Sequence, residues 1–70
     1  NSHFVYQSGE ELILNIQGDV QILDVLGRVV YNGEAMNDIN RINVSSFNSG
    51  AYMVRVMNGN EVKVEKVVIY

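Results

Sequence analysis

The chain has 70 residues, 47% of them hydrophobic and 19% charged, which is the balance of one small folded domain. It has no cysteine and a single histidine, so the composition excludes a disulfide framework and the usual thiolate or histidine-rich metal sites. The formal net charge of −3 argues against nucleic acid as a partner, and no apolar run is long enough to insert into a membrane. We therefore expect no cofactor and no metal.

The first third of the chain alternates in polarity as strands do. Leu12, Leu14 and Ile16 share one face of a predicted strand, and residues 4–6 add a strand before it. Gly18-Asp19, which follows, has the composition of a two-residue hairpin turn.

The segment after this turn contains a second strand and two more turn signals. Val20 and Ile22 alternate with Gln21, Leu23 and Val25. Both faces are therefore fairly apolar, which predicts a central strand covered on both sides. Asp24-Val25-Leu26-Gly27 has Asp at the first and Gly at the fourth position of a type I turn, and Arg28 resumes the strand. Asn32-Gly33 is the strongest hairpin signal in the chain. Residues 34–38 are predicted to form a loop or a poor edge strand.

The clearest strands lie in the second half. Residues 39–44 and 51–57 are predicted strands, separated by a turn cluster over 45–50. Residues 58–60 turn the chain, and 61–70 pair back antiparallel, with the valines at 62 and 64 opposite Lys63 and Glu65. The inward side chains predicted for the first two of these strands are Ile42, Val44, Tyr52, Val54 and Val56.

Six or seven short strands with turns between them, and no helical period, predict an all-β fold. We expect an antiparallel immunoglobulin-like β-sandwich and leave open a small closed barrel. Residues 1–9 are interpreted as an N-terminal edge or linker remnant, and residues 10–70 as the domain. The first residue is Asn and no export signal is visible, so we expect a piece of a longer protein.

The residues that catalysis would need are not grouped in this sequence. The only histidine is His3, near the start of the chain, and the eight acidic residues are spread over predicted turns and strand edges. No glycine-rich phosphate loop is present. We predict that the domain is not an enzyme.

Three features remain as candidates for binding. The terminal run 67–70 is apolar on both faces and fits either a last strand of the sandwich or strand addition to a partner. Met53 and Met57 beside Arg55 form either a soft recognition patch or a second packing face. Arg28 can close onto Asp24 as a turn clamp, or contact a partner.

Four segments of the chain, in the same order and spacing, resemble the C-terminal sorting domains of type IX secretion. They are the D-x-x-G-R segment at 24–28, the N-x-I-x-V-S stretch at 40–46, the G-x-Y-x-V-R-V segment at 50–56 and the closing hairpin with the final strand at 66–69. The Tyr70 end and the stretch 34–38 depart from the family pattern. The residues that we assign to partner recognition on this basis are Asp24, Gly27, Arg28, Gly50, Tyr52, Arg55, Gly59, Lys63, Lys66, Val67, Val68, Ile69 and Tyr70.

The resemblance implies an immunoglobulin-like sandwich that serves as a secretion signal in certain Gram-negative bacteria. Cargo domains precede it, and the type IX translocon, shuttle and sortase are its implied partners. The cargo passes through the periplasm and then crosses the outer membrane to the cell surface. A sortase usually removes the domain and joins the cargo to anionic lipopolysaccharide. The alternative is a retained structural or adhesive module of a surface protein. An apolar last strand also predicts self-association, including exchange of a terminal strand.

Overall fold

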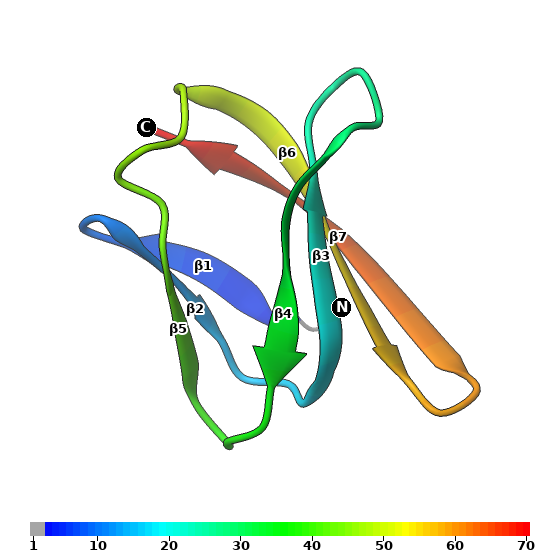
Figure 1. Cartoon of the computed structure of the whole chain (residues 1–70). Helices are drawn as coiled ribbons and strands as arrows, with labels where there is room; N and C mark the ends of the chain where they lie inside the picture. The colour runs from blue at the N-terminus through cyan, green and yellow to red at the C-terminus, as the bar shows by residue number, and fades with distance from the viewer. Residues whose placement is uncertain (1–2) are drawn as a thin grey trace.

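The computed structural model describes residues 3–70, which fold into seven strands and no helix (Figure 1). The first two residues of the segment interpreted as a remnant lie outside the described range. The strands are β1 (Val5–Ser8), β2 (Glu11–Leu14), β3 (Gly18–Leu23), β4 (Val29–Ala35), β5 (Asn40–Asn43), β6 (Gly50–Asn58) and β7 (Glu61–Ile69).

The strands form two antiparallel sheets with the orders β1-β2-β5 and β4-β3-β6-β7. The chain crosses between the sheets after β2, after β4 and after β5, which gives the strand order of an immunoglobulin-like sandwich. The predicted fold is confirmed. Among residues 3–70 no ladder joins β1 to β7, so the sheets remain two layers and do not close into a barrel.

The core lies between the inner faces of the two sheets. It receives alternate residues from each strand, as the period of two predicts. The predicted inward positions Ile42, Val44, Tyr52, Val54 and Val56 are all buried. The other members of the buried cluster are Val5, Leu12, Leu14, Val20, Ile22, Ala35 and Ile69.

Three of the predicted turns are confirmed, one of them the cluster over 45–50, where the N–H of Phe47 donates to the carbonyl of Val44 across 3.0 Å. The N–H of Gly27 donates to the carbonyl of Asp24 across 3.0 Å and closes another turn, between β3 and β4. The third turn joins β6 to β7, where Asn58 pairs with Glu61. Within residues 3–70 no helix has the length and apolarity needed to cross a membrane.

The hairpin turn predicted at Asn32-Gly33 is wrong, because both residues lie inside β4. Gly33 pairs with Val20 of β3, and a Cβ built on it would lie 2.6 Å from the Tyr31 hydroxyl. The glycine therefore makes room for the tyrosine side chain on the same strand. β4 continues to Ala35 as an edge strand, in agreement with the edge-strand interpretation of the first part of 34–38.

The hairpin turn predicted at Gly18-Asp19 is also wrong. Residues 15–17 carry the chain from β2 in one sheet to β3 in the other, so β2 and β3 are not paired. Gly18 has a φ of 142°, and a Cβ on it would lie 2.5 Å from the carbonyl oxygen of Met57. A glycine is needed here because the crossing brings two backbones together.

The central position predicted for residues 20–23 is confirmed, but the cover on both sides is not. Val20 and Ile22 are buried, whereas Gln21 and Leu23 on the outer face are only half-buried. The same asymmetry holds for β7, where the predicted alternation is confirmed but Val62 and Val64 face outward and are 52% and 50% exposed. The outer face of the larger sheet thus carries apolar side chains, and residues 3–70 form no third layer over them.

Candidate functional site

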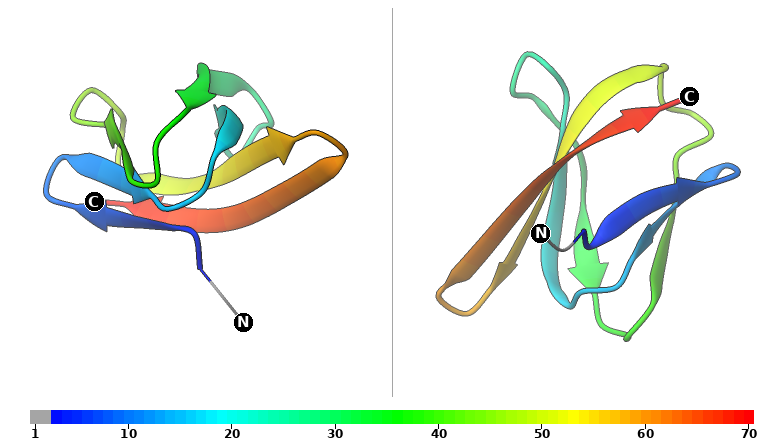
Figure 2. Two further views of the ribbon diagram at one scale, coloured as in Figure 1. Left: turned by 90° about the horizontal axis from the view of Figure 1, so that it is seen from below. Right: turned by 180° about the vertical axis from the view of Figure 1, so that it is seen from behind.

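One edge of β7, the last strand of the larger sheet, has no partner strand in the described chain. One side of β7 pairs with β6 along its whole length, from Gly50–Ile69 to Asn58–Glu61. The other side faces β1, which runs beside it in the same direction (Figure 2). Both are edge strands of their own sheets, and no backbone ladder joins them in the described chain.

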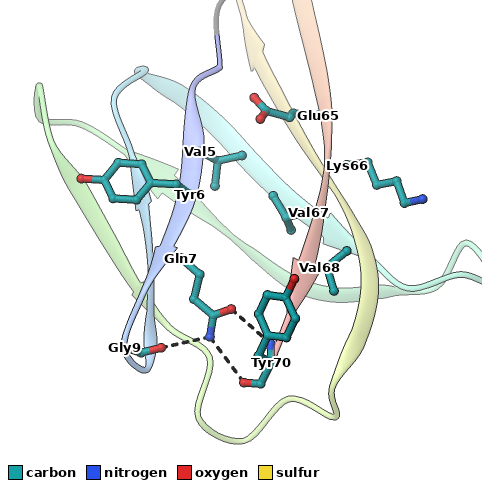
Figure 3. Close-up of a pocket in the computed structure, with 9 residues that line it drawn as sticks. All are labelled: Val5, Tyr6, Gln7, Gly9, Glu65, Lys66, Val67, Val68 and Tyr70. Atoms are coloured by element: carbon teal, nitrogen blue, oxygen red, sulfur yellow. Dashed lines mark hydrogen bonds between the residues drawn. The ribbon is translucent and has the colours of Figure 1, made fainter.

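A glutamine side chain bridges the two edges at one end. The N–H of Tyr70 donates to Oε1 of Gln7 across 3.1 Å, and Nε2 of Gln7 donates to the carbonyl of Gly9 at 2.9 Å (Figure 3). The same Nε2 lies 3.5 Å from the Tyr70 carbonyl. The carboxamide therefore occupies the position in which a peptide group of an adjoining strand would pair with Tyr70.

A carboxylate bridges the edges at the other end. Oε1 of Glu65 accepts a hydrogen bond from the N–H of Phe4 at 2.9 Å, and Oε2 lies 2.7 Å from Nδ1 of His3. These side-chain contacts hold β1 beside β7 in place of a ladder. Side chains can be displaced one by one, whereas a ladder must be broken cooperatively.

A groove of about 530 Å³ lies between the two bridges. Because successive residues of a strand turn their backbone groups to opposite sides, the direction of the Tyr70 N–H shows that Lys66 and Val68 also present their N–H and C=O groups to the groove. Val68 and Tyr70 are exposed along this edge. The arrangement can bind an extended polypeptide through its backbone.

The predicted turn clamp at Asp24 is present. Oδ1 of Asp24 accepts hydrogen bonds from the N–H groups of Leu26 and Arg28, at 2.9 and 3.0 Å, and Oδ2 accepts one from Nε of Arg28 at 2.8 Å. The Arg28 N–H has the largest influence on the pKa of Asp24, and together with the Arg28 side chain and the Leu26 N–H it outweighs desolvation and holds that pKa below 3.8. The turn thus depends on an ionised aspartate.

This turn meets the ends of β6 and β7 at a second hollow, of about 420 Å³. The hollow brings together four residues assigned to recognition from the sequence, in three separate motifs: Asp24, Gly27, Tyr52 and Lys66. Its apolar lining comes from Leu23, Val25, Ala51 and Met53.

Tyr52 serves the fold more than the surface. It is 9% exposed, its ring packs on Phe47 at 5.6 Å between centroids, and its hydroxyl donates to the Asn48 carbonyl at 2.6 Å. A tyrosine that bonds back to the preceding loop is typical of immunoglobulin-like domains.

The remaining assigned residues do not form one cluster. Gly50 begins β6 and Gly59 forms the tip of the β6–β7 hairpin, at the opposite end of the sheet. Arg55 lies on the outer face, where Nη1 donates to Oε1 of Gln21 at 3.0 Å. Lys63 is exposed, and the positions of the terminal run alternate: Val67 and Ile69 point to the core, Val68 and Tyr70 to solvent.

The sequence interpretation missed the two bridging residues, Gln7 and Glu65. Nothing in the local pattern of either residue marks it, because its function depends on a strand about sixty positions away. Residues 3–70 contain no group of His, Cys, Asp or Glu side chains placed to hold a metal ion.

The domain is thus a small sandwich, and one edge of its last strand is not paired with another strand of the described chain. A family model described as a secretion system C-terminal sorting domain matches residues 4–70, and the chain belongs to this family. The family comprises the C-terminal signals of type IX secretion, so the recognised resemblance is confirmed. No curated protein and no solved structure matches the chain.

Membership settles the broad function. The domain is a signal that interacts with the type IX secretion machinery. It directs export of the protein that carries it to the cell surface or the extracellular space. The family is one of secretion signals and not of enzymes.

Proposed function

We propose that the type IX machinery reads this domain by adding a strand along the free edge of β7. The observation that carries the proposal is the Tyr70 backbone, whose N–H is satisfied by the Gln7 carboxamide instead of by a neighbouring strand. A receptor strand can displace the Gln7 carboxamide and form a row of backbone hydrogen bonds with β7. Backbone pairing also suits a receptor that must accept many unrelated cargo proteins, because it depends little on side chains.

The side chains along β7 divide into two roles in this proposal. Val67 and Ile69 hold the strand to the core, and Val68 and Tyr70 supply exposed apolar contacts for the receptor. Lys63 and Lys66 set the register of the added strand. Arg28, Arg55 and the two glycines at 50 and 59 stabilise the turns and the sheet that support this edge.

We further propose that the domain is read in the periplasm, during transit and before the outer membrane. The partners proposed are the translocon, a shuttle and a sortase. The sortase then removes the domain and joins the cargo to anionic lipopolysaccharide. Membership of the sorting-domain family supports this scheme, and the test uses the domain joined to a cargo protein.

A fusion tests the function. An export signal, a fluorescent reporter and this domain are joined in that order and expressed in a type IX-competent strain and in a translocon-deficient strain. Surface reporter in the competent strain alone is the expected result, with loss of about 8 kDa if the domain is cleaved, since the chain has a mass of 7.9 kDa. Reporter held in the periplasm of both strains would contradict the proposal. Surface reporter with its C-terminus intact would instead indicate a retained module.

Removal of residues 67–70 is predicted to block export, but it also removes Ile69, which is 2% exposed in the core. Val68→Pro is a cleaner variant, because it blocks the edge and leaves the core side chains in place.

A further inference from the structure

The outer face of the β6–β7 hairpin has the polarity expected of an inner face. The face consists of the outward residues of the two strands, which the register pairs as Ala51–Val68, Met53–Lys66, Arg55–Val64 and Met57–Val62. Six of these eight side chains are apolar and two are cationic. The outward face of an antiparallel strand is ordinarily polar.

Exposure shows that the fold itself does not cover this face. Val62, Val64 and Val68 are 52%, 50% and 45% exposed, and Met53 is 38% exposed. On the other face of β7, the charged residues Glu61, Lys63 and Glu65 occupy the inward positions. The far end of the hairpin projects beyond the smaller sheet in both views of Figure 2, so Glu61 and Lys63 reach water, whereas Glu65 is half-buried beside β1. No strand of the described chain covers the valines.

The charge on this face is opposite in sign to that of the chain. The chain carries eight acidic and five basic residues, yet the eight outward positions of the hairpin include Arg55 and Lys66 and no acid. Ion pairs in residues 3–70 join His3 to Glu65 and Arg28 to Asp24, so neither Arg55 nor Lys66 has a carboxylate partner there. Two acidic residues lie close to this face: Asp19 of β3, opposite Met57, and Asp24, which lines a hollow with Met53 and Lys66 but pairs with Arg28.

We infer that the outer face of the β6–β7 hairpin docks a partner protein that presents an apolar surface with carboxylates opposite Arg55 and Lys66. This inference rests on the proposed function, within which the partner is a component of the export machinery. Docking of this partner would bury the exposed valines and neutralise the charges of Arg55 and Lys66. It lies beside the edge of β7, so one receptor can contact the edge and the face together.

Two other occupants fit the face less well. A second copy of the chain would bring the same cationic, acid-free surface against Arg55 and Lys66, and like charges in contact are unfavourable. An anionic membrane would be repelled by the net charge of −3 and by Asp19, which lies on the same sheet face opposite Met57.

The reporter fusion described above provides the test, with two variants of the face. Val62→Thr with Val64→Thr keeps the side-chain shape and removes the apolar contact, and Arg55→Glu reverses one charge. Each is expected to lower surface reporter on the order of tenfold, the equivalent of about 1.4 kcal/mol of contact free energy. Matched controls are Val30→Thr, on the 44% exposed Val30 of β4, and Arg41→Glu on β5, both expected to export normally.

The outcomes distinguish a failure of this docking inference from a failure of the proposed function. Thermal unfolding of each purified domain first confirms that the variants fold. Normal export of both face variants, with the parent fusion exported, would overturn this inference and leave the proposed function standing. Failure of the parent fusion would overturn both. Binding to phosphatidylglycerol vesicles, or a dimer in light scattering, that is lost in the same variants would assign the face to a membrane or to a second copy and overturn the inference.

Discussion

Asp24 stabilises its turn in the ionised form. Its carboxylate accepts three hydrogen bonds within five residues, two of them from backbone N–H groups that would otherwise face solvent. An asparagine could keep the Oδ1 contacts but not the charge. The D-x-x-G-R segment at 24–28 therefore stabilises its own turn.

The first prediction concerns the pH dependence of this turn. Because the pKa of Asp24 is lower in the folded state than the ordinary 3.8, its contribution to stability is complete above that value and disappears as the pH falls through the folded pKa. Asp24→Asn should lower the melting temperature at pH 7, and the difference between the two proteins should shrink as the pH falls below 3.8. Melting curves of both proteins from pH 7 to below pH 3.8 provide the check, and a constant difference between them would contradict the account.

The second prediction compares two glycines. Gly18 has a φ of 142° and no space for a Cβ beside the Met57 carbonyl, whereas Gly9 has a φ of 60° and open space around it. Gly9→Ala should cost about 1 kcal/mol of the free energy of unfolding, from the left-handed conformation alone. Gly18→Ala should cost at least about 2 kcal/mol more, because backbone must move as well. Urea unfolding measures both, and equal costs would refute the close approach.

At the scale of the strands, side-chain period was a better guide than turn composition. The faces of β5 and β6 follow directly from alternating residues, since a one-residue error would expose the whole core set. The hairpin turns predicted at Asn32-Gly33 and Gly18-Asp19 are wrong because glycine has two uses that look alike in the sequence. It occurs in tight turns, and it also occurs where a neighbouring side chain or backbone comes too close for a Cβ. Only tertiary contacts with Tyr31 and Met57 distinguish these cases.

The part of the candidate site that lies in β7 was predictable from the sequence, and the part contributed by β1 was not. The sequence indicated that residues 61–70 form the last strand and that its end is apolar. It did not indicate that β1 runs beside β7, so Gln7 and Glu65 were not among the candidates. It also left open which face of β7 points outward, because valines and charged residues alternate and either set could face the core.

The third prediction tests the edge of β7. The N–H of Val68 points away from β6, so Val68→Pro removes a groove-facing donor and leaves the β6–β7 ladder intact. Export of the reporter fusion should fall sharply. Val68→Ala, which shortens the side chain but keeps the N–H, should reduce export much less. Equal effects of the two variants would show that recognition uses the side chain and not the backbone.

At the scale of the whole molecule, an unpaired edge predicts contact between copies. We expect the isolated domain to dimerise at about millimolar concentration through β7, by edge pairing or by strand exchange. Gln7→Ala should strengthen the dimer, because it frees the Tyr70 backbone. Light scattering of the parent and the variant measures this, and monomers of both at that concentration would count against it.

The position of Ile69 has a consequence for the timing of synthesis. This residue, the last of β7, lies in the core at 2% exposure, and β7 pairs with β6 along its full length. The sandwich therefore cannot close while β7 is still inside the ribosome. A polypeptide released early would carry a complete cargo but no folded signal, so the export pathway would receive only proteins whose translation had reached this strand.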